Sequence, residues 1–427
     1  MSCKHAYKLK WITGVIVLIY ISFTCYTSYL LLSRDHSKQA DHRSTNKVEN
    51  LRAEDEWNPW GEELHRSAAL RSAAKYQRNT SVVDSSRTVE IWGKAAIGLY
   101  TWQHIFNGQL LPKAGGAWSY GYQRVGDIKF KFRTGPGIAP STVPSDVTHV
   151  LLVLNGRTPE KIKAAKVWLN SLPSFSKLQK AAAIVLGDED CSGNMWLLPY
   201  VASRGGLLSA VFLVYDTALV DGKEFFQWPL GVATYRGFPK ASASTVDITS
   251  KRPYLCNFLG TVYKGSSREE LVSVLRSDNI GKQCFVKHRN EWQPLETRES
   301  LEMYTLALEH SDLTLNPVGK NPECYRIYEA ASYGSVPVVE DRLVSSQCAT
   351  AEDGGPLRLL KKYGAPFVYV RNWTVELPRV LERERRLSVQ EKVKRRRNLI
   401  AWYEGFKRSM KEELVKVIQW KFFDKAL

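Results

Sequence analysis

The chain has 427 residues and carries 60 Lys and Arg against 43 Asp and Glu, a formal net charge of +17. A charge of this size suits a nucleic-acid-binding protein, but the topology predicted below argues against contact with nucleic acid. The cysteines form no CxxC pair and no cluster with His at metal-ligand spacing, which argues against structural zinc.

The N-terminal segment predicts a membrane anchor. Residues 11–32 form an uncharged, mostly apolar run, long enough to cross a bilayer core of about 30 Å as a helix. Lys4, Lys8 and Lys10 precede this run, so the positive-inside rule leaves residues 1–10 in the cytosol. A cleaved signal peptide would have a shorter apolar region and a small-residue cleavage site. We therefore expect an uncleaved signal anchor, with the rest of the chain in the secretory lumen or outside the cell.

Residues 33–87 are polar and charged, which predicts a luminal stem. Asn79-Thr80-Ser81 in this stem and Asn372-Trp373-Thr374 further on are N-glycosylation sequons, so both asparagines could carry glycans if exposed in the lumen.

Five cysteines would share that oxidising lumen: Cys191, Cys256, Cys284, Cys324 and Cys348. Because five is odd, at least one of them is free or pairs with another chain. Cys256 with Cys284 is one candidate disulfide, and the sequence leaves the connectivity open.

The remainder is long enough for two domains, and the first is expected at 88–245. Short, almost wholly apolar runs at 149–156, 181–188 and 207–216 end in polar residues or Gly. Such runs are typical of strands buried on both faces of a parallel sheet. Residues 160–172, between the first two runs, have the apolar spacing of a helix.

The second domain, 246–427, repeats this style. Its expected strands lie at 253–262, 283–288, 312–318, 336–341 and 366–373, and helical stretches near 266–276, 298–310 and 322–333 separate most of them. The predicted architecture is therefore α/β, with two Rossmann-like units joined near 226–250 and a ligand in a cleft at the carboxyl ends of the strands.

From residue 376 onward the sequence is strongly helical, and we expect closing helices that cross back to the first unit. Basic residues crowd one part of this region: Lys392, Lys394, Arg395, Arg396 and Arg397. We interpret the run as a solvated helix face; the alternative is a surface that attracts an anionic substrate such as a phosphorylated glycan.

Residues 312–341 are the most informative stretch for function. They read as a strand, a Gly-containing loop, a helix that Gly334 stops, and a second buried strand. In the loop, Gly319 allows close approach of a ligand, while Asn321 is a good N-cap with Pro322 as the first helical residue. The helix dipole and backbone N–H groups would attract phosphate there, next to Lys320. An ordinary strand–helix–strand unit fits the same pattern.

Two charged residues of the same helix fit a nucleotide. Arg326 offers a fork for two phosphate oxygens, and Glu329, three residues later, can accept hydrogen bonds from ribose hydroxyls. An ordinary surface ion pair between the two is the alternative.

Carboxylates at the ends of first-unit strands are candidates for a general base. Asp188, Glu189 and Asp190 follow one strand, Asp216 follows another, and His104 is a weaker candidate. Asp188-Glu189-Asp190 also spells D-x-D, a known metal-binding motif. Since a phosphate site built on Arg326 and a helix N-terminus can neutralise phosphate, we expect catalysis without a metal.

These segments carry a family resemblance. RIYEAASYGSVPVVED (326–341) resembles the donor-binding segment of exostosin-type glycosyltransferases, written roughly R-x-x-E-A-x-x-x-G-x-x-P-V. RPYLCNFLGT (252–261) is similar to the first strand and Gly turn of their donor domain, and FQWPLGV (226–232) to their interdomain crossing. Within that family, closer similarity to single-pass Golgi xylosyltransferases is carried by segments 54–60, 91–100, 226–236 and 323–341.

The resemblance implies a GT-B architecture and an inverting, direct transfer of xylose from UDP-xylose to ribitol 5-phosphate. The acceptor would be the phosphorylated O-mannosyl glycan of α-dystroglycan, which fukutin and fukutin-related protein extend. It also implies a type II protein of the Golgi membrane, and adds Gly260 and Thr261 to the donor site. A non-catalytic, glycan-binding or scaffolding Golgi protein with the same fold is the alternative.

Overall fold

A computed structural model describes residues 87–424, apart from 114–115, 242–243, 277, 292, 294–295, 344, 346–347 and 349–353. The predicted anchor at 11–32, nearly all of the stem and the sequon at Asn79 lie outside the described residues. Within the described ranges, no helix has the length and apolar character needed to cross a membrane.

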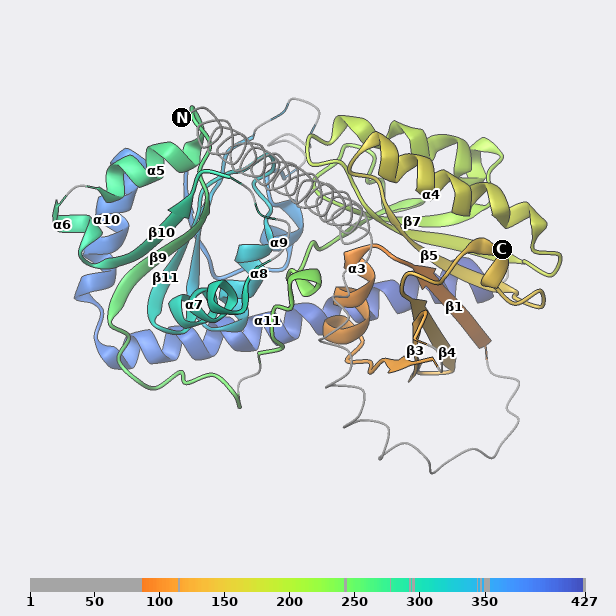
Figure 1. Ribbon diagram of the computed structural model, residues 1–427, viewed down its shortest axis with the longest axis horizontal. Coiled ribbons are helices and arrows are strands. Elements are labelled where there is room, and N and C mark those ends of the chain that lie inside the picture. Colours follow the sequence, from red (N-terminus) through yellow and green to blue (C-terminus); the bar gives the residue numbers. More distant parts are fainter. Residues whose placement is uncertain are drawn as a thin grey trace, which may run out of the picture. The chain divides into compact units, whose positions relative to one another are not determined.

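The first lobe is built on an eight-stranded sheet with the order β2-β3-β4-β1-β5-β6-β7-β8 (Figure 1). The six strands from β4 to β8 in this order run parallel, whereas β3 is antiparallel to β4 and β2 is antiparallel to β3. Its strands are β1 (Arg87–Gly93), β2 (Leu111–Pro112), β3 (Ser119–Val125), β4 (Ile128–Thr134), β5 (His149–Asn155), β6 (Lys180–Leu186), β7 (Leu208–Val214) and β8 (Phe225–Trp228). The apolar runs predicted as strands are confirmed as β5, β6 and β7.

Helical segments cover both faces of this sheet. On one face α3 (Ala96–Leu99) continues into a π-helical turn, η2 (Tyr100–Ile105), whose aromatic side chains pack on β4. On the other face lies α4 (Pro159–Ser171), which begins after the N-cap Thr158 and confirms the predicted helix. Short 3-10 turns complete the lobe: η3 (Pro140–Thr142), η4 (Leu172–Ser174), η5 (Ser192–Tyr200), η6 (Ala202–Arg204) and η7 (Thr234–Arg236).

The second lobe is built on a five-stranded, fully parallel sheet with the order β10-β9-β11-β12-β13. Its strands are β9 (Tyr254–Thr261), β10 (Cys284–Arg289), β11 (Ser311–Asn316), β12 (Val336–Glu340) and β13 (Val368–Val370), and its helices are α5 (Ser267–Leu275), α6 (Asp278–Gly281), α7 (Arg298–Glu309), α8 (Tyr325–Ser332) and α9 (Arg358–Lys362). The α/β prediction is confirmed. The strand predicted at 366–373 is too long, because Asn372 caps α10 through Val375 N and Trp373 is already helical.

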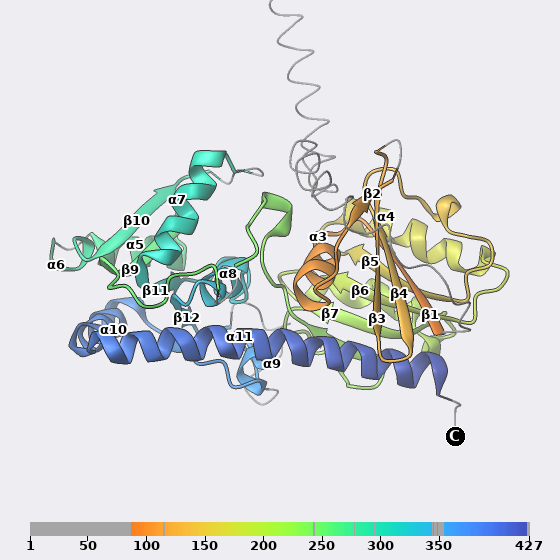
Figure 2. The same cartoon turned by 90° about the horizontal axis from the view of Figure 1, so that it is seen from below.

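The C-terminal helices α10 (Trp373–Arg386) and α11 (Val389–Ile418) end in the turn η8 (Gln419–Phe423). Ser388 and Glu391 form a capping box that starts α11. This long helix returns to the first lobe (Figure 2), where the hydroxyls of Tyr403 and Tyr100 lie 3.2 Å apart and the His149 ring packs on Phe423. The prediction that the tail crosses back is therefore confirmed.

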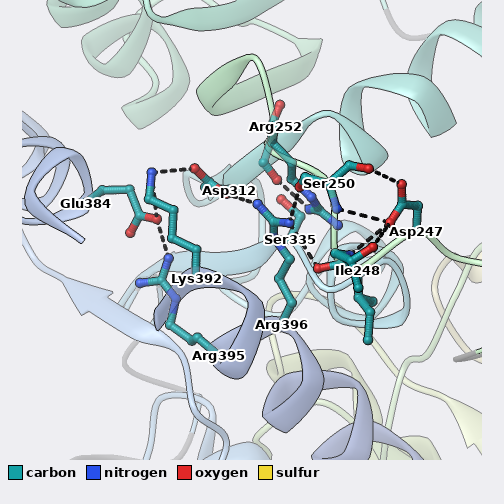
Figure 3. Close-up of polar contacts among 12 residues, drawn as sticks. Asp247, Ile248, Ser250, Arg252, Asp312, Ser335, Glu384, Lys392, Arg395 and Arg396 are labelled. Carbon is teal, nitrogen blue, oxygen red and sulfur yellow. Dashed lines mark hydrogen bonds and ion pairs between the residues drawn. The ribbon is translucent and has the colours of Figure 1, made fainter. Parts of the chain in front are cut away.

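The basic run on α11 does not form a uniformly solvated face, so that interpretation is wrong for three of its members (Figure 3). Lys392 and Arg396 bind the two oxygens of Asp312 at 2.8 and 2.6 Å, and Arg395 binds Glu384. Both carboxylates are 2% exposed, so the charges pair inside the lobe. Lys394 and Arg397 do face solvent.

Candidate active site at a strand switch point

The second sheet has one position where the chain changes direction across it. From β9 the chain passes through α5 to β10 on one side, and from β11 it passes through α8 to β12 on the other side. In doubly wound sheets a ligand binds at the carboxyl ends of the strands beside such a switch point. Gly260 and Thr261 end β9, and the loop 317–324 follows β11, so the predicted donor segments meet there.

Arg326, the second residue of α8, points back to the end of β9. Its Nη2 donates to the carbonyl of Leu259 at 2.8 Å, and its guanidinium lies over the Phe258 ring. A Cβ on Gly260 would lie 2.6 Å from this Nη2, so glycine makes the approach possible. Nε and Nη1 of Arg326 are buried without a partner. Several buried arginines leave Nε unpaired, so the additional unpaired Nη1 is the more informative atom.

Arg268, the second residue of α5, comes from the other side of the switch point. Its Nη1 donates to the carbonyl of Thr261 at 2.9 Å, and a Cβ on Gly319 would lie 2.6 Å from its Nη2. Burial, and then the nearby positive charge of Arg326, lowers the pKa of Arg268. Among the described residues neither guanidinium forms an ion pair with a carboxylate. Two adjacent cations with free N–H groups constitute an anion site.

The ends of the two helices add to this field. The N-cap of α8 is Cys324, which makes no side-chain capping hydrogen bond, so the first N–H groups of α8 remain available. The predicted cap is thus wrong: α8 begins at Tyr325, not at Pro322. Asn321 instead accepts from Glu323 N at 2.9 Å, which folds 321–323 into a turn before the helix.

A buried carboxylate, Glu340 at the end of β12, holds the loop in place. It is 1% exposed and accepts hydrogen bonds from Val318 N, from the Trp373 indole N–H and from the Ser267 hydroxyl. These bonds tie the β11 loop to the starts of α5 and α10. Lys320 stands at the exposed tip of the same loop.

Glu329 lies behind the anion site rather than in it. It is 5% exposed; one carboxylate oxygen accepts from Ala233 N at 3.0 Å and the other from the Tyr304 hydroxyl at 2.6 Å. Burial raises its pKa. The bond to Ala233 anchors the segment that connects the two sheets, so this geometry provides a structural contact, while the ribose role stays a prediction.

On the first-lobe side, the candidate bases have different surroundings. Asp216 is 6% exposed, and its oxygens accept from Gln227 Nε2 and from Arg358 N, so it joins the lobes structurally. Asp188 accepts from Gly193 N at 2.9 Å and organises its own loop. Asp190 is exposed, and His104 is partly buried; desolvation, and then the charges of Lys407 and Lys240, lower its pKa to about 3.

Glu189 is the candidate that reaches the anion site. Its side chain is 30% exposed, pairs with Arg157 at 2.7 Å and lies near the Tyr215 hydroxyl. Its backbone carbonyl accepts from Asn321 Nδ2 at 2.8 Å, and its charge acts on Arg268. Hence the structure joins the Glu189 backbone to Asn321, two residues after the Gly319 that Arg268 approaches. Arg157 and Arg268 were missed from the sequence because each is distant in the chain from the 312–341 motif. Glu340 lies within that motif, but its partners Ser267 and Trp373 do not, so its role was missed as well.

Two disulfides fix this region. Cys191, next to the Glu189 loop, bonds Cys348 of the second lobe, and Cys256–Cys284 joins β9 to β10 as the candidate pairing predicted. Cys324 is free, which confirms the odd count. Among the described residues no three His, Cys, Asp or Glu side chains are placed to hold a metal. Asn372 of the second sequon is exposed.

Comparison with known proteins covers nearly the whole chain. Residues 89–229 match the family model for the RXYLT1 N-terminal domain, and residues 235–423 match that for the RXYLT1 C-terminal domain. The chain is 44% identical to ribitol-5-phosphate xylosyltransferase 1 of Danio rerio over 96% of this chain and 97% of that protein. Its identity to the proteins of the same name from Mus musculus and Homo sapiens is 42% and 41%, over 96% and 97% of this chain and 97% and 98% of theirs.

Proposed function

Because the chain belongs to the ribitol-5-phosphate xylosyltransferase family, we propose that it transfers xylose from UDP-xylose to ribitol 5-phosphate. The protein is then a glycosyltransferase of GT-B architecture. The two lobes, each with a parallel sheet, and the donor-type switch point in the second lobe support this assignment.

The pair Arg268 and Arg326 is the observation that carries the proposal. In the transfer, the bond between xylose C1 and the β-phosphate oxygen breaks, and negative charge grows on the departing UDP. Two cations with N–H groups already oriented, beside the uncapped start of α8, stabilise that charge without reorganising. This arrangement supplies the positive charge for which other glycosyltransferases recruit a metal, so we propose that the reaction is metal-independent.

Glu189 is our candidate for the general base. An inverting displacement needs a base that takes the proton of the attacking acceptor hydroxyl while its oxygen bonds to C1. Glu189 combines partial exposure with a backbone hydrogen bond to Asn321 of the donor loop, whereas both oxygens of Asp216 are occupied. Arg157 would orient the Glu189 carboxylate through their ion pair.

The proposed location of the enzyme and the identity of its acceptor rest on the sequence. We propose that the enzyme is anchored in the Golgi membrane by residues 11–32, with its catalytic part in the lumen. The acceptor would be the phosphorylated O-mannosyl glycan of α-dystroglycan, with fukutin and fukutin-related protein acting on the same glycan.

The decisive experiment assays a luminal protein beginning near residue 33 with a panel of UDP-sugars and ribitol 5-phosphate acceptors. We expect transfer from UDP-xylose only, unchanged by EDTA. Binding of glycan without consumption of any UDP-sugar would instead support the non-catalytic scaffold. Activity that disappears with EDTA and returns with manganese would overturn metal independence alone.

A further inference from the structure

The exposed face of the β3–β4 hairpin carries alternating aromatic and basic side chains, and we call it the hairpin face. Tyr120 lies opposite Arg133 and Tyr122 opposite Lys131, and directly opposed residues point to the same side of an antiparallel pair. The face consists of Trp118, Tyr120 and Tyr122 with Lys113, Arg124, Lys129, Lys131 and Arg133. The opposite face of β4 is buried in the core of the first lobe.

The rings and cations of this face touch one another. Trp118, Tyr120 and Tyr122 form consecutive edge-on pairs, with ring centroids 6.1 and 5.6 Å apart. Lys113 lies over the Trp118 ring at 4.6 Å and Lys129 over the Tyr122 ring at 5.5 Å. Tyr122 is nevertheless 49% exposed, so an open aromatic surface remains beside fixed positive charge.

Among the described residues, the cations of the hairpin face outnumber the carboxylates that pair with them. Glu90, 7% exposed, pairs with both Lys131 and Arg133, and Asp127 at the hairpin turn pairs with Arg87. Charge on an edge strand prevents edge-to-edge aggregation, but β4 lies between β3 and β1. Edge protection therefore explains neither the cations of β4 nor the aromatic row beside them, in which Tyr122 is exposed and Trp118 and Tyr120 are partly exposed.

We propose that the hairpin face binds a phosphorylated carbohydrate. The C–H face of a sugar ring packs on Tyr or Trp, whose hydroxyl or N–H can still bond to sugar hydroxyls. Phosphate then binds the lysines that stand over the same rings. An unphosphorylated glycan would use only the aromatic rings of this face, and a purely ionic ligand would use only its cations.

The position suits a long acceptor, an argument that rests on the proposed function. Strands β4, β1, β5 and β6 are parallel, so Trp118 and Arg133 lie along the same carboxyl edge of the sheet as Glu189 after β6. Four strand spacings separate β3 from β6, about 19 Å. A phosphorylated glycan that presents its end at Glu189 can therefore extend to the hairpin face.

A matched pair of double variants tests this. The first variant combines Tyr122→Ser with Lys129→Ser. The control combines Trp420→Ser with Lys421→Ser, which removes another exposed aromatic ring with a lysine over it, 3.8 Å from the centroid. The luminal protein is titrated with an oligosaccharide carrying one phosphomonoester, and with the same sugar after phosphatase treatment. We expect the first variant to weaken binding of the phosphorylated sugar at least about tenfold, and the control to leave it unchanged.

Activity separates this proposal from the proposed function. With free ribitol 5-phosphate as acceptor, the first variant should keep the KM of the unaltered protein, because that acceptor is too short to reach β3. Equal affinity of the unaltered protein and the first variant for the phosphorylated sugar would overturn the hairpin-face proposal while leaving the enzyme assignment intact. Binding of single-stranded RNA as tight as that of the phosphorylated sugar would also overturn it, since the rings and cations would then not select a carbohydrate.

Discussion

The second lobe contains two groups of arginines that differ in burial and in what surrounds them. Arg252 and Arg396 are buried, whereas Arg268 and Arg326 are partly buried. Both terminal nitrogens of Arg252 donate hydrogen bonds to carbonyl oxygens of neighbouring segments. In Arg396, one terminal nitrogen donates to such carbonyls and the other to the Asp312 carboxylate. Arg268 and Arg326 make one hydrogen bond each, both to the end of β9, and have no carboxylate partner among the described residues. Arg268 and Arg326 are partly withdrawn from water, and such a cation is costly without an internal counter-ion. Their retention indicates that an external anion completes the site.

Removing the counter-ion of the first group should produce the largest loss of stability. Asp312→Asn leaves Arg396 and Lys392 buried beside a neutral amide, one of whose atoms is itself a donor. We expect the free energy of unfolding to fall by about 3–5 kcal/mol, as for other broken buried ion pairs. Chemical denaturation of the luminal protein measures this.

A variant of the second group, Arg326→Ala, is the control for Asp312→Asn. Arg326→Ala removes a cation that has unpaired buried nitrogens, so its effect on unfolding should stay within about 1 kcal/mol. A loss of stability as large as that of Asp312→Asn would mean that Arg326 is structural and that the two groups do not differ.

Arg326→Ala should act on the reaction instead. We expect kcat/KM for UDP-xylose to fall by about 10²-fold to 10³-fold, because the charge on the leaving diphosphate loses an oriented donor. Arg268→Ala should have a similar effect, and Arg326→Lys should recover only part of the activity since lysine lacks the planar fork. Steady-state kinetics and titration with UDP measure these effects for the variants of Arg326 and Arg268. Unchanged turnover in folded Arg326→Ala would reject the donor site.

The same comparison shows what the sequence can predict. Strands such as β5 and β12 are buried on both faces, so their continuous apolar runs identify them locally. The hairpin β3–β4 was not predicted, because only alternate residues of Ile128–Thr134 are buried and continuous apolar runs do not describe it. Its period of two was visible in the sequence.

Contacts between residues that are distant in the chain were harder to predict than the strands. Arg326 belongs to a local motif, whereas Arg268 joins it only because β9 lies beside β11. For Lys392 and Arg396, the deciding contact is Asp312, 80 and 84 residues away in the chain. Asn321 has an ordinary N-cap sequence, and its competing turn to Glu323 N decides where α8 starts.

The comparison extends to Glu323, a buried carboxyl group that forms no ion pair with any cation of the described residues. This residue is 6% exposed, accepts from Leu230 N and the Tyr328 hydroxyl, and has its pKa raised to about 7 by burial. Between the unfolded value of 4.5 and about 7, the folded state holds a proton that the unfolded state releases. Stability from this group is therefore lost as pH rises through that window, on the order of 3 kcal/mol in total.

Glu323→Gln should remove this dependence, because the amide oxygen can accept both hydrogen bonds and carries no charge. We expect the variant to match the unaltered protein at pH 4.5 and to be more stable at pH 8, as measured by the midpoint of thermal unfolding. His104 contributes in the opposite direction, since its folded pKa is lowered and stability falls as pH drops below 6.5. Both proteins carry His104, so its contribution cancels in the difference. Parallel pH curves would contradict the assignment to Glu323.

The smallest effect is expected at Lys320, and it separates buried charge from charge in general. Lys320 is exposed at the tip of the loop that also carries Gly319, so solvent and salt screen its attraction for phosphate. Lys320→Ala should lower kcat/KM for UDP-xylose less than about threefold, and the loss should vanish at high ionic strength. The loss in Arg326→Ala should persist there, because hydrogen bonds from a partly buried fork are less screened than the charge of an exposed lysine. If Lys320→Ala proved as damaging as Arg326→Ala, net positive charge rather than the oriented N–H groups of Arg268 and Arg326 would bind the donor.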